Sequence, residues 1–108
     1  MKINTKQLFE NILKKGKAYR SQHLLLKTLE IKNIKKSQFY FVVSGKIIKK
    51  AIKRNLFKRQ GRHITRCVKT KNCCIAIFFA KKGTGDLKFA ELKEEAFDLM
   101  KKAKLFEK

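Results

Sequence analysis

The chain has 108 residues, of which 44% are hydrophobic, and a chain of this size forms one domain whose core buries roughly 65% of the unfolded surface. It has 29 Lys and Arg residues but only 8 Asp and Glu residues, so the net charge is +21. The positive charges repel one another, and binding to a polyanion such as nucleic acid or an anionic membrane reduces this repulsion. No apolar run reaches the roughly 20 residues that span a bilayer, and no signal-peptide pattern opens the sequence, so we expect a cytoplasmic protein with a single domain over residues 1–108.

A helix is predicted within the first sixteen residues. Asn4 is a suitable N-cap with Gln7 as its capping-box partner, and Gly16 fits the C-terminal end of the helix. The apolar residues between them recur at helical spacing and comprise Leu8, Phe9, Ile12 and Leu13. By their spacing alone, these side chains form an ordinary core face.

Two strands are predicted next. Residues 24–29 are typical of a strand, residues 31–37 of a polar connection, and residues 38–44 of a second strand rich in aromatic and β-branched side chains. We expect these two strands to pair as a hairpin, and the residues after Gly16 leave room for a further short strand.

Residues 51–66 sort into two faces when they are read at about 100° per residue. The apolar arc consists of Ile52, Leu56, Phe57, Ile64, Cys67 and Val68. The opposite, basic arc consists of Arg54, Asn55, Lys58, Arg59, Arg62 and Arg66. We therefore expect a helix whose apolar arc packs on the core while its basic arc faces a partner.

This helix also concentrates arginine, because it holds four of the chain's five Arg residues, whereas the chain has 24 Lys residues. The guanidinium is a planar fork that binds phosphate bidentately and stacks on flat rings, so this face offers directed hydrogen bonds and stacking as well as positive charge. Residues 46–50 are predicted to form a basic loop before the helix, because Ile47 and Ile48 would otherwise lie opposite the apolar arc. Lys53 falls on the apolar arc and is expected to reach water from the first turn, and Gly61 weakens the helix by about 1 kcal/mol relative to Ala.

The last strand and the last helix complete the predicted fold. Residues 73–80 are apolar on both faces, as in a central strand, and the last helix opens at Asp86 or Lys88. Its apolar stripe consists of Phe89, Leu92, Ala96, Leu99, Met100 and Ala103. The order α-β-β-α-β-α predicts an α+β sandwich in which helices pack on one sheet.

No set of side chains predicts catalysis or metal binding by the protein itself. The two His residues have no nucleophile at a recognisable spacing, and the segment between Glu30 and Asp86 holds 16 Lys and Arg residues but no acid that could bind a catalytic metal. The candidate zinc ligands lack CxxC and HxxxH spacing and comprise Cys67, Cys73, Cys74, His23 and His63. We expect no catalytic residue, no metal site and buried free thiols in a reducing compartment.

Nucleic-acid binding is the leading prediction, and RNA is favoured over duplex DNA. No helix-turn-helix is visible, whereas aromatic residues lie on or beside the predicted strands, where they can stack on unpaired bases. They are Tyr19, Phe39, Tyr40, Phe41 and Phe78, and most of them must belong to the core. A membrane-surface role is disfavoured because the core needs the apolar arc of the basic helix.

One motif in the predicted helix is specific, and it reads Arg54-Asn55-x-x-Lys58-Arg59-x-x-Arg62, preceded by Lys50-Ala51-Ile52. It resembles the signature helix of the bacterial ribonuclease P protein subunit. Residues 9–16, 75–82 and 89–95 are similar to the first helix, the last strand and the last helix of that family. The resemblance implies an αβββαβα two-layer sandwich, like domain 2 of ribosomal protein S5, with a left-handed βαβ crossover through the signature helix, against the usual right-handed rule.

The resemblance also implies a function. In that family the catalytic RNA, with bound Mg²⁺, removes the 5′ leader of precursor tRNA as an endonuclease, while the protein binds the leader and contacts the catalytic RNA. For this chain it implies an accessory subunit of ribonuclease P, monomeric in a 1:1 complex with that RNA, with Mg²⁺ held mainly by RNA subunit and substrate. The expected RNA contacts are Arg54, Asn55, Lys58, Arg59 and Arg62, and the basic surface around them adds Lys50, Lys53 and Arg66. The leader-binding cleft would include Phe9, Leu13 and Lys27.

The chain departs from the family pattern at several positions. Leu56 and His63 replace a basic and an acidic residue of the motif, and Leu13 and Lys27 stand where aromatic rings are usual. Gln60-Gly61 replaces an apolar pair. We therefore expect leader binding that depends more on charge and less on stacking. The alternative is a small basic ribosomal protein or another structural RNA-binding protein.

Overall fold

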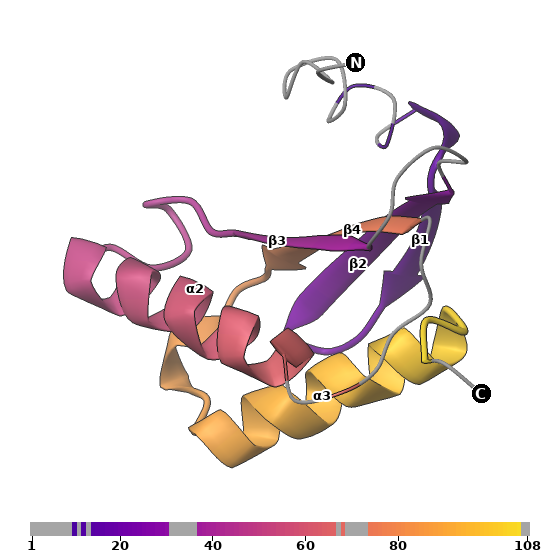
Figure 1. Cartoon of the computed structure of the whole chain (residues 1–108). Coiled ribbons are helices and arrows are strands. Elements are labelled where there is room, and N and C mark those ends of the chain that lie inside the picture. Colours follow the sequence, from indigo (N-terminus) through magenta and orange to yellow (C-terminus); the bar gives the residue numbers. More distant parts are fainter. Residues whose placement is uncertain are drawn as a thin grey trace.

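The computed structural model describes residues 10, 12, 14–30, 37–66, 68 and 74–106. Within them the strands are β1 (Lys17–Arg20), β2 (Leu24–Glu30), β3 (Gln38–Val42) and β4 (Cys74–Ala80). The helices are α2 (Ala51–Arg66), the short 3₁₀ helix η1 (Thr84–Asp86) and α3 (Phe89–Lys102). Figure 1 shows α2 and α3 on the same side of one mixed sheet, which confirms the predicted α+β sandwich.

The end of the predicted first helix is seen at Gly16. Phe9 and Leu13 lie outside the described residues, but Ile12 is helical, and its carbonyl accepts a hydrogen bond from the Gly16 N–H at 2.9 Å. This is the i to i−4 bond of an α-helix. A Cβ on Gly16 would lie 2.7 Å from the carbonyl oxygen of Thr28, so only glycine lets the chain pass this close to β2.

The sheet has the strand order β1-β2-β4-β3. Because β4 pairs antiparallel with β2 and parallel with β3, the predicted hairpin between residues 24–29 and 38–44 is wrong. The physical reason is burial: Ile75 and Ile77 are fully buried on one face of β4, and Phe78 on the other. A strand that is apolar on both faces is stable in the middle of a sheet, where it displaces the pairing of sequence neighbours.

Two further topological features follow from the pairing. β1 pairs antiparallel with β2, which confirms the short strand after Gly16. The parallel neighbours β3 and β4 are joined through α2, so α2 is a crossover helix. The left-handed sense of this crossover stays a prediction.

The larger core lies between the sheet and the two helices. The Phe41 ring of β3 stacks on Phe78 of β4 with centroids 4.9 Å apart, and it meets Phe57 of α2 edge-on at 5.9 Å. Phe57 is only 4% exposed, so these three rings join α2 to the sheet. From α3 the buried side chains are Leu92, Ala96, Leu99 and Met100, in agreement with the predicted stripe.

The packing of α2 differs from the predicted arc. Its buried residues are Phe57, Gly61 and Ile64, whereas Ile52 and Leu56 are exposed. The expectation that these last two pack on the core is wrong, and Gly61 supplies the reason. A Cβ at Gly61 would collide with the Phe41 ring, so the helix approaches the sheet through its glycine and turns Ile52 and Leu56 outward.

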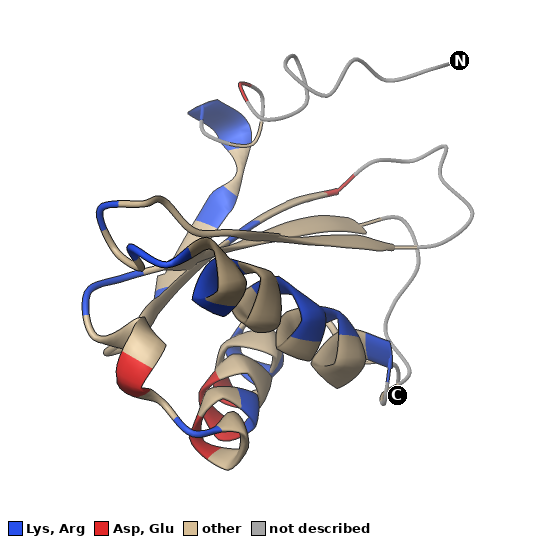
Figure 2. Ribbon diagram, turned by 90° about the vertical axis from the view of Figure 1, so that its left-hand side faces the viewer, with Lys and Arg blue, Asp and Glu red and all other residues tan. Residues whose placement is uncertain are grey.

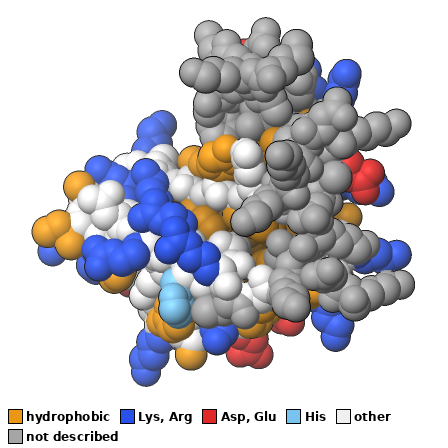
Figure 3. Space-filling view, in the orientation of Figure 1, with side chains coloured by type: hydrophobic (Ala, Val, Ile, Leu, Met, Phe, Trp, Pro, Cys, Tyr) orange, Lys and Arg blue, Asp and Glu red, His pale blue; other side chains and the backbone are white. Residues whose placement is uncertain are grey.

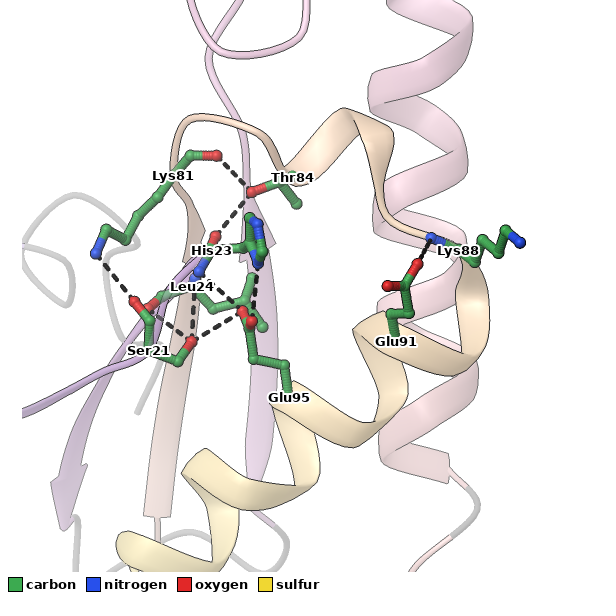
Figure 4. A network of polar contacts seen from close by, with 8 residues as sticks. All are labelled: Ser21, His23, Leu24, Lys81, Thr84, Lys88, Glu91 and Glu95. Carbon is green, nitrogen blue, oxygen red and sulfur yellow. Dashed lines mark hydrogen bonds and ion pairs between the residues drawn. The ribbon is translucent and has the colours of Figure 1, made fainter.

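A polar network holds the loop between β4 and α3 in place (Figure 4). Glu95 of α3 accepts hydrogen bonds from the Ser21 hydroxyl at 2.9 Å and from the His23 backbone N–H at 3.0 Å, and its other oxygen lies 2.9 Å from His23 Nδ1. The His23 carbonyl accepts from the Lys81 N–H at 2.8 Å and from the Thr84 hydroxyl at 2.7 Å. Since these bonds join the β1–β2 turn, the η1 loop and α3, they give the loop a defined position beside α2.

The opening of α3 matches one of the two predicted starts. Lys88 is the N-cap, and its backbone N–H donates to the Glu91 carboxylate at 3.0 Å. Asp86 instead ends η1. Glu91 in the first turn and Lys101 and Lys102 in the last turn suit the helix dipole, as the sequence predicts.

Candidate nucleic-acid interface

The outward face of α2 gathers the side chains that the sequence predicts for RNA contact. Figure 2 marks the positions of Lys and Arg along this helix and in the loop before it, and Figure 3 shows Lys and Arg side chains on the surface over the helix. Of the residues predicted to contact RNA, the exposed ones are Lys50, Lys53, Asn55, Lys58, Arg59, Arg62 and Arg66. Because the first turn of α2 carries no acid and no acid occurs between Glu30 and Asp86, this segment contributes positive charge without internal compensation.

Arg54 is placed differently from the other arginines. It is half-buried, and its Nη1 donates hydrogen bonds to the carbonyls of Ile48 at 2.9 Å and Lys49 at 2.8 Å. Ile48 itself is buried, at 5% exposure. Arg54 therefore folds the basic loop back onto the first turn of α2, and this places Lys49 and Lys50 beside the helix cations.

We expect Arg54→Ala to lower the free energy of unfolding by about 1–2 kcal/mol, because it removes two charge-assisted hydrogen bonds at a half-buried site. Arg62→Ala, at an exposed position of the same helix, is expected to change it by less than about 0.5 kcal/mol. Urea denaturation of both variants measures the difference. Equal stability of the two would show that the bonds of Arg54 do not hold the loop.

A second surface lies on the sheet face opposite α2 and α3. Lys27 of β2 pairs in register with Ile77 of β4, which pairs with Tyr40 of β3. Directly paired residues point to the same face of a sheet, so Lys27 and Tyr40 flank Ile77 on this side. Ile12 packs on the same face against Ile75 and Ile77. Lys27 is half-buried there, while the other predicted cleft residues, Phe9 and Leu13, lie outside the described ranges.

The strand aromatics divide between the two faces. Phe41 and Phe78 are buried in the core, and Tyr19 and Phe39 pack against that core from partly exposed positions. Tyr40 alone of the five predicted candidates belongs to the opposite face. Sequence alternation with Phe41 could have placed it there, because neighbouring residues of a strand point to opposite sides.

A shallow cavity of about 250 Å³ lies where the basic loop, the first turn of α2 and the η1 loop meet. Its lining residues are Ile47, Ile48, Lys49, Lys50, Lys53, Gly83, Gly85 and Asp86. Three of these are Lys and one is Asp, so the cavity extends the positive end of α2. No sequence pattern pointed to it, because the η1 loop reaches α2 only through the tertiary fold.

The structure describes the surroundings of some of the candidate metal ligands and cysteine thiols. In the parts of the chain that the structure describes, no three His, Cys, Asp or Glu side chains are grouped to hold a metal ion. Cys74 is a buried free cysteine, and burial, followed by the nearby Glu30 carboxylate, raises the pKa of its thiol. Of the other cysteines, Cys67 and Cys73 fall outside these parts. Among the described residues, no helix is both long and apolar enough to cross a bilayer.

Comparisons with known proteins agree with the geometry. A family model described as Ribonuclease P matches residues 1–104. A Staphylococcus aureus RNase P protein structure is 23% identical, with a TM-score of 0.86, over 97% of this chain and 96% of that chain. A mutant of the S. aureus protein with defective mRNA degradation activity is 24% identical, with a TM-score of 0.87, over 96% of this chain and 88% of that chain. The RNase P protein from Thermotoga maritima is 21% identical, with a TM-score of 0.80, over 94% of this chain and 96% of that chain.

At these identities the structural matches establish the fold. No curated protein sequence matches the chain.

Proposed function

The chain belongs to the Ribonuclease P family, and on this premise we propose that it is the protein subunit that binds the 5′ leader of precursor tRNA and assists the catalytic RNA in removing it. The observation that carries the proposal is the outward face of α2, which presents Arg59, Arg62 and Arg66 together with Lys53 and Lys58. Such a face neutralises several phosphates of a structured RNA at once, and each contact releases counterions.

The two surfaces have different roles in this proposal. The arginines of α2 bind phosphates bidentately, which fixes the register of the protein on folded RNA. The opposite sheet face suits a single strand, because Lys27 offers a cation and Tyr40 offers a ring on which an unpaired base can stack. Phe9 and Leu13 complete this cleft in the proposal.

Mg²⁺ belongs to the RNA in this proposal. The chain offers no clustered ligands for it among the described residues, and we place the ion on the catalytic RNA and the substrate. The protein contributes positive charge, which lowers the repulsion between the phosphates of leader and catalytic RNA. The complex then requires less Mg²⁺ to hold its substrate.

The assembly is a monomeric protein in a 1:1 complex with the catalytic RNA, working in the cytoplasm. The net charge of +21 favours association with RNA over association with a second copy of the chain.

Leader recognition is tested by comparing two substrates. The complex of chain and cognate catalytic RNA should bind precursor tRNA more tightly than mature tRNA. This difference in affinity should shrink when the protein is omitted or when the Lys27→Ala variant is used in its place. Filter binding at fixed salt and Mg²⁺ gives the six affinities, one for each substrate with the chain, without it and with the Lys27→Ala variant. Equal affinity for precursor and mature tRNA, with co-purification of the chain on ribosomal subunits, would instead support the alternative of a structural ribosomal protein.

A further inference from the structure

Two large apolar side chains remain exposed on α2. Ile52 is 82% exposed and Leu56 is 42% exposed. They are four residues apart, so they are neighbours on one side of the helix. Rotating α2 to bury them would expose Phe57 and Ile64 and would lose the close contact at Gly61. The fold therefore keeps this pair in solvent.

The apolar pair lies among groups that bind nucleic acid. Asn55 and Arg59 follow Ile52 and Leu56 by three residues each, and side chains three apart are adjacent on a helix. Both are exposed, and so is Lys53. In Figure 3 hydrophobic atoms at this end of α2 lie between those of Lys and Arg. The surface thus combines a small apolar area with cations and one amide.

This combination selects among three kinds of occupant. A second copy of the chain would bring two strongly basic helices face to face, since the segment between Glu30 and Asp86 has no acid. A bilayer needs a longer apolar stripe than two side chains. An unpaired base of RNA has flat apolar faces and is attached to phosphates, so it satisfies both the apolar pair and the surrounding charges.

We propose that Ile52 and Leu56 form a contact surface for an unpaired base of the bound RNA, with Arg59 and Asn55 at its margin. The aliphatic side chains cover one face of the base and lose their exposed area to it. Arg59 neutralises the adjoining phosphate, and the Asn55 amide can hydrogen-bond to the base edge. This inference rests on the proposed function and adds to it that α2 recognises RNA by shape as well as by charge.

The experiment measures RNA affinity of the full chain and of the variant Ile52→Ala/Leu56→Ala. The two probes are a single-stranded RNA oligonucleotide and a perfectly paired RNA duplex of equal length, each titrated at several salt concentrations. Arg59→Gln is the matched control because it removes a charge from the same surface. Circular dichroism confirms that each variant is folded.

For the double Ala variant we expect affinity for the single strand to fall about tenfold, and affinity for the duplex to fall less than about twofold. The dependence of affinity on salt should stay unchanged, because no phosphate contact is lost. Arg59→Gln should instead flatten the salt dependence on both probes. Unchanged affinity for the single strand, or an equal loss on both probes, would overturn the inference.

The result is separable from the test of the proposed function. If the double variant loses single-strand affinity but the chain gives no leader-dependent binding to precursor tRNA, the base contact is supported and the proposed function is contradicted. If the chain recognises the leader but the double variant binds the single strand as tightly as the unchanged chain does, the proposed function is supported and the base contact is contradicted.

Discussion

Phe57→Ala is expected to lower the free energy of unfolding by about 3–5 kcal/mol, because it deletes a buried ring and leaves a cavity. The ring is 4% exposed and makes the edge-on contact with Phe41 that ties α2 to the sheet. Guanidinium denaturation, followed by circular dichroism, measures the change.

The neighbouring Leu56→Ala is the matched control, since Leu56 lies one residue away and is 42% exposed. Its effect on the free energy of unfolding is expected to stay below about 1 kcal/mol. If Leu56→Ala were as destabilising as Phe57→Ala, the orientation of α2 about its axis, which places Gly61 against Phe41, would be wrong.

The double variant Arg59→Ala/Arg62→Ala is expected to weaken RNA binding strongly while the protein stays folded. Each lost phosphate contact should reduce the slope of log affinity against log salt by about 0.7–0.9. Both side chains are exposed on α2, so their removal leaves the core intact. Affinity for the catalytic RNA over a salt series gives the slope.

Lys102→Ala is the control for this measurement, because Lys102 is an exposed cation at the end of α3. Its removal changes the net charge by one unit but leaves the α2 surface complete, so the slope should stay the same. If the slope falls as much for Lys102→Ala as it does per arginine removed in the double variant, RNA binding depends on the net charge of the protein and not on this face of α2.

The sequence allowed the elements to be predicted better than their arrangement. The predicted start of the basic helix at residue 51 is confirmed, because a clear period of about 3.6 residues and a basic loop mark its limits. The hairpin between residues 24–29 and 38–44 is wrong, because pairing by proximity in sequence ignored how strongly a strand with two apolar faces prefers the centre of the sheet.

The candidate site could be predicted to a similar degree. The density of arginine identified the α2 surface, and the structure exposes seven of the eight predicted cations and amides there while half-burying Arg54. That Arg54 fixes the basic loop was not predictable, because its acceptors are backbone carbonyls, which carry no sequence signal. The outward turn of Ile52 was missed because an apolar arc on a helical wheel cannot reveal that a glycine, with no side chain, faces the sheet.

The central claim is that this chain acts with a catalytic RNA on precursor tRNA. The most direct test is the rate of 5′ leader removal from precursor tRNA by the cognate catalytic RNA at low Mg²⁺, with and without the chain. We expect no cleavage by the chain alone and a clear rise in rate when it is added to the RNA. An unchanged rate, under conditions where the chain binds that RNA, would contradict the proposed function.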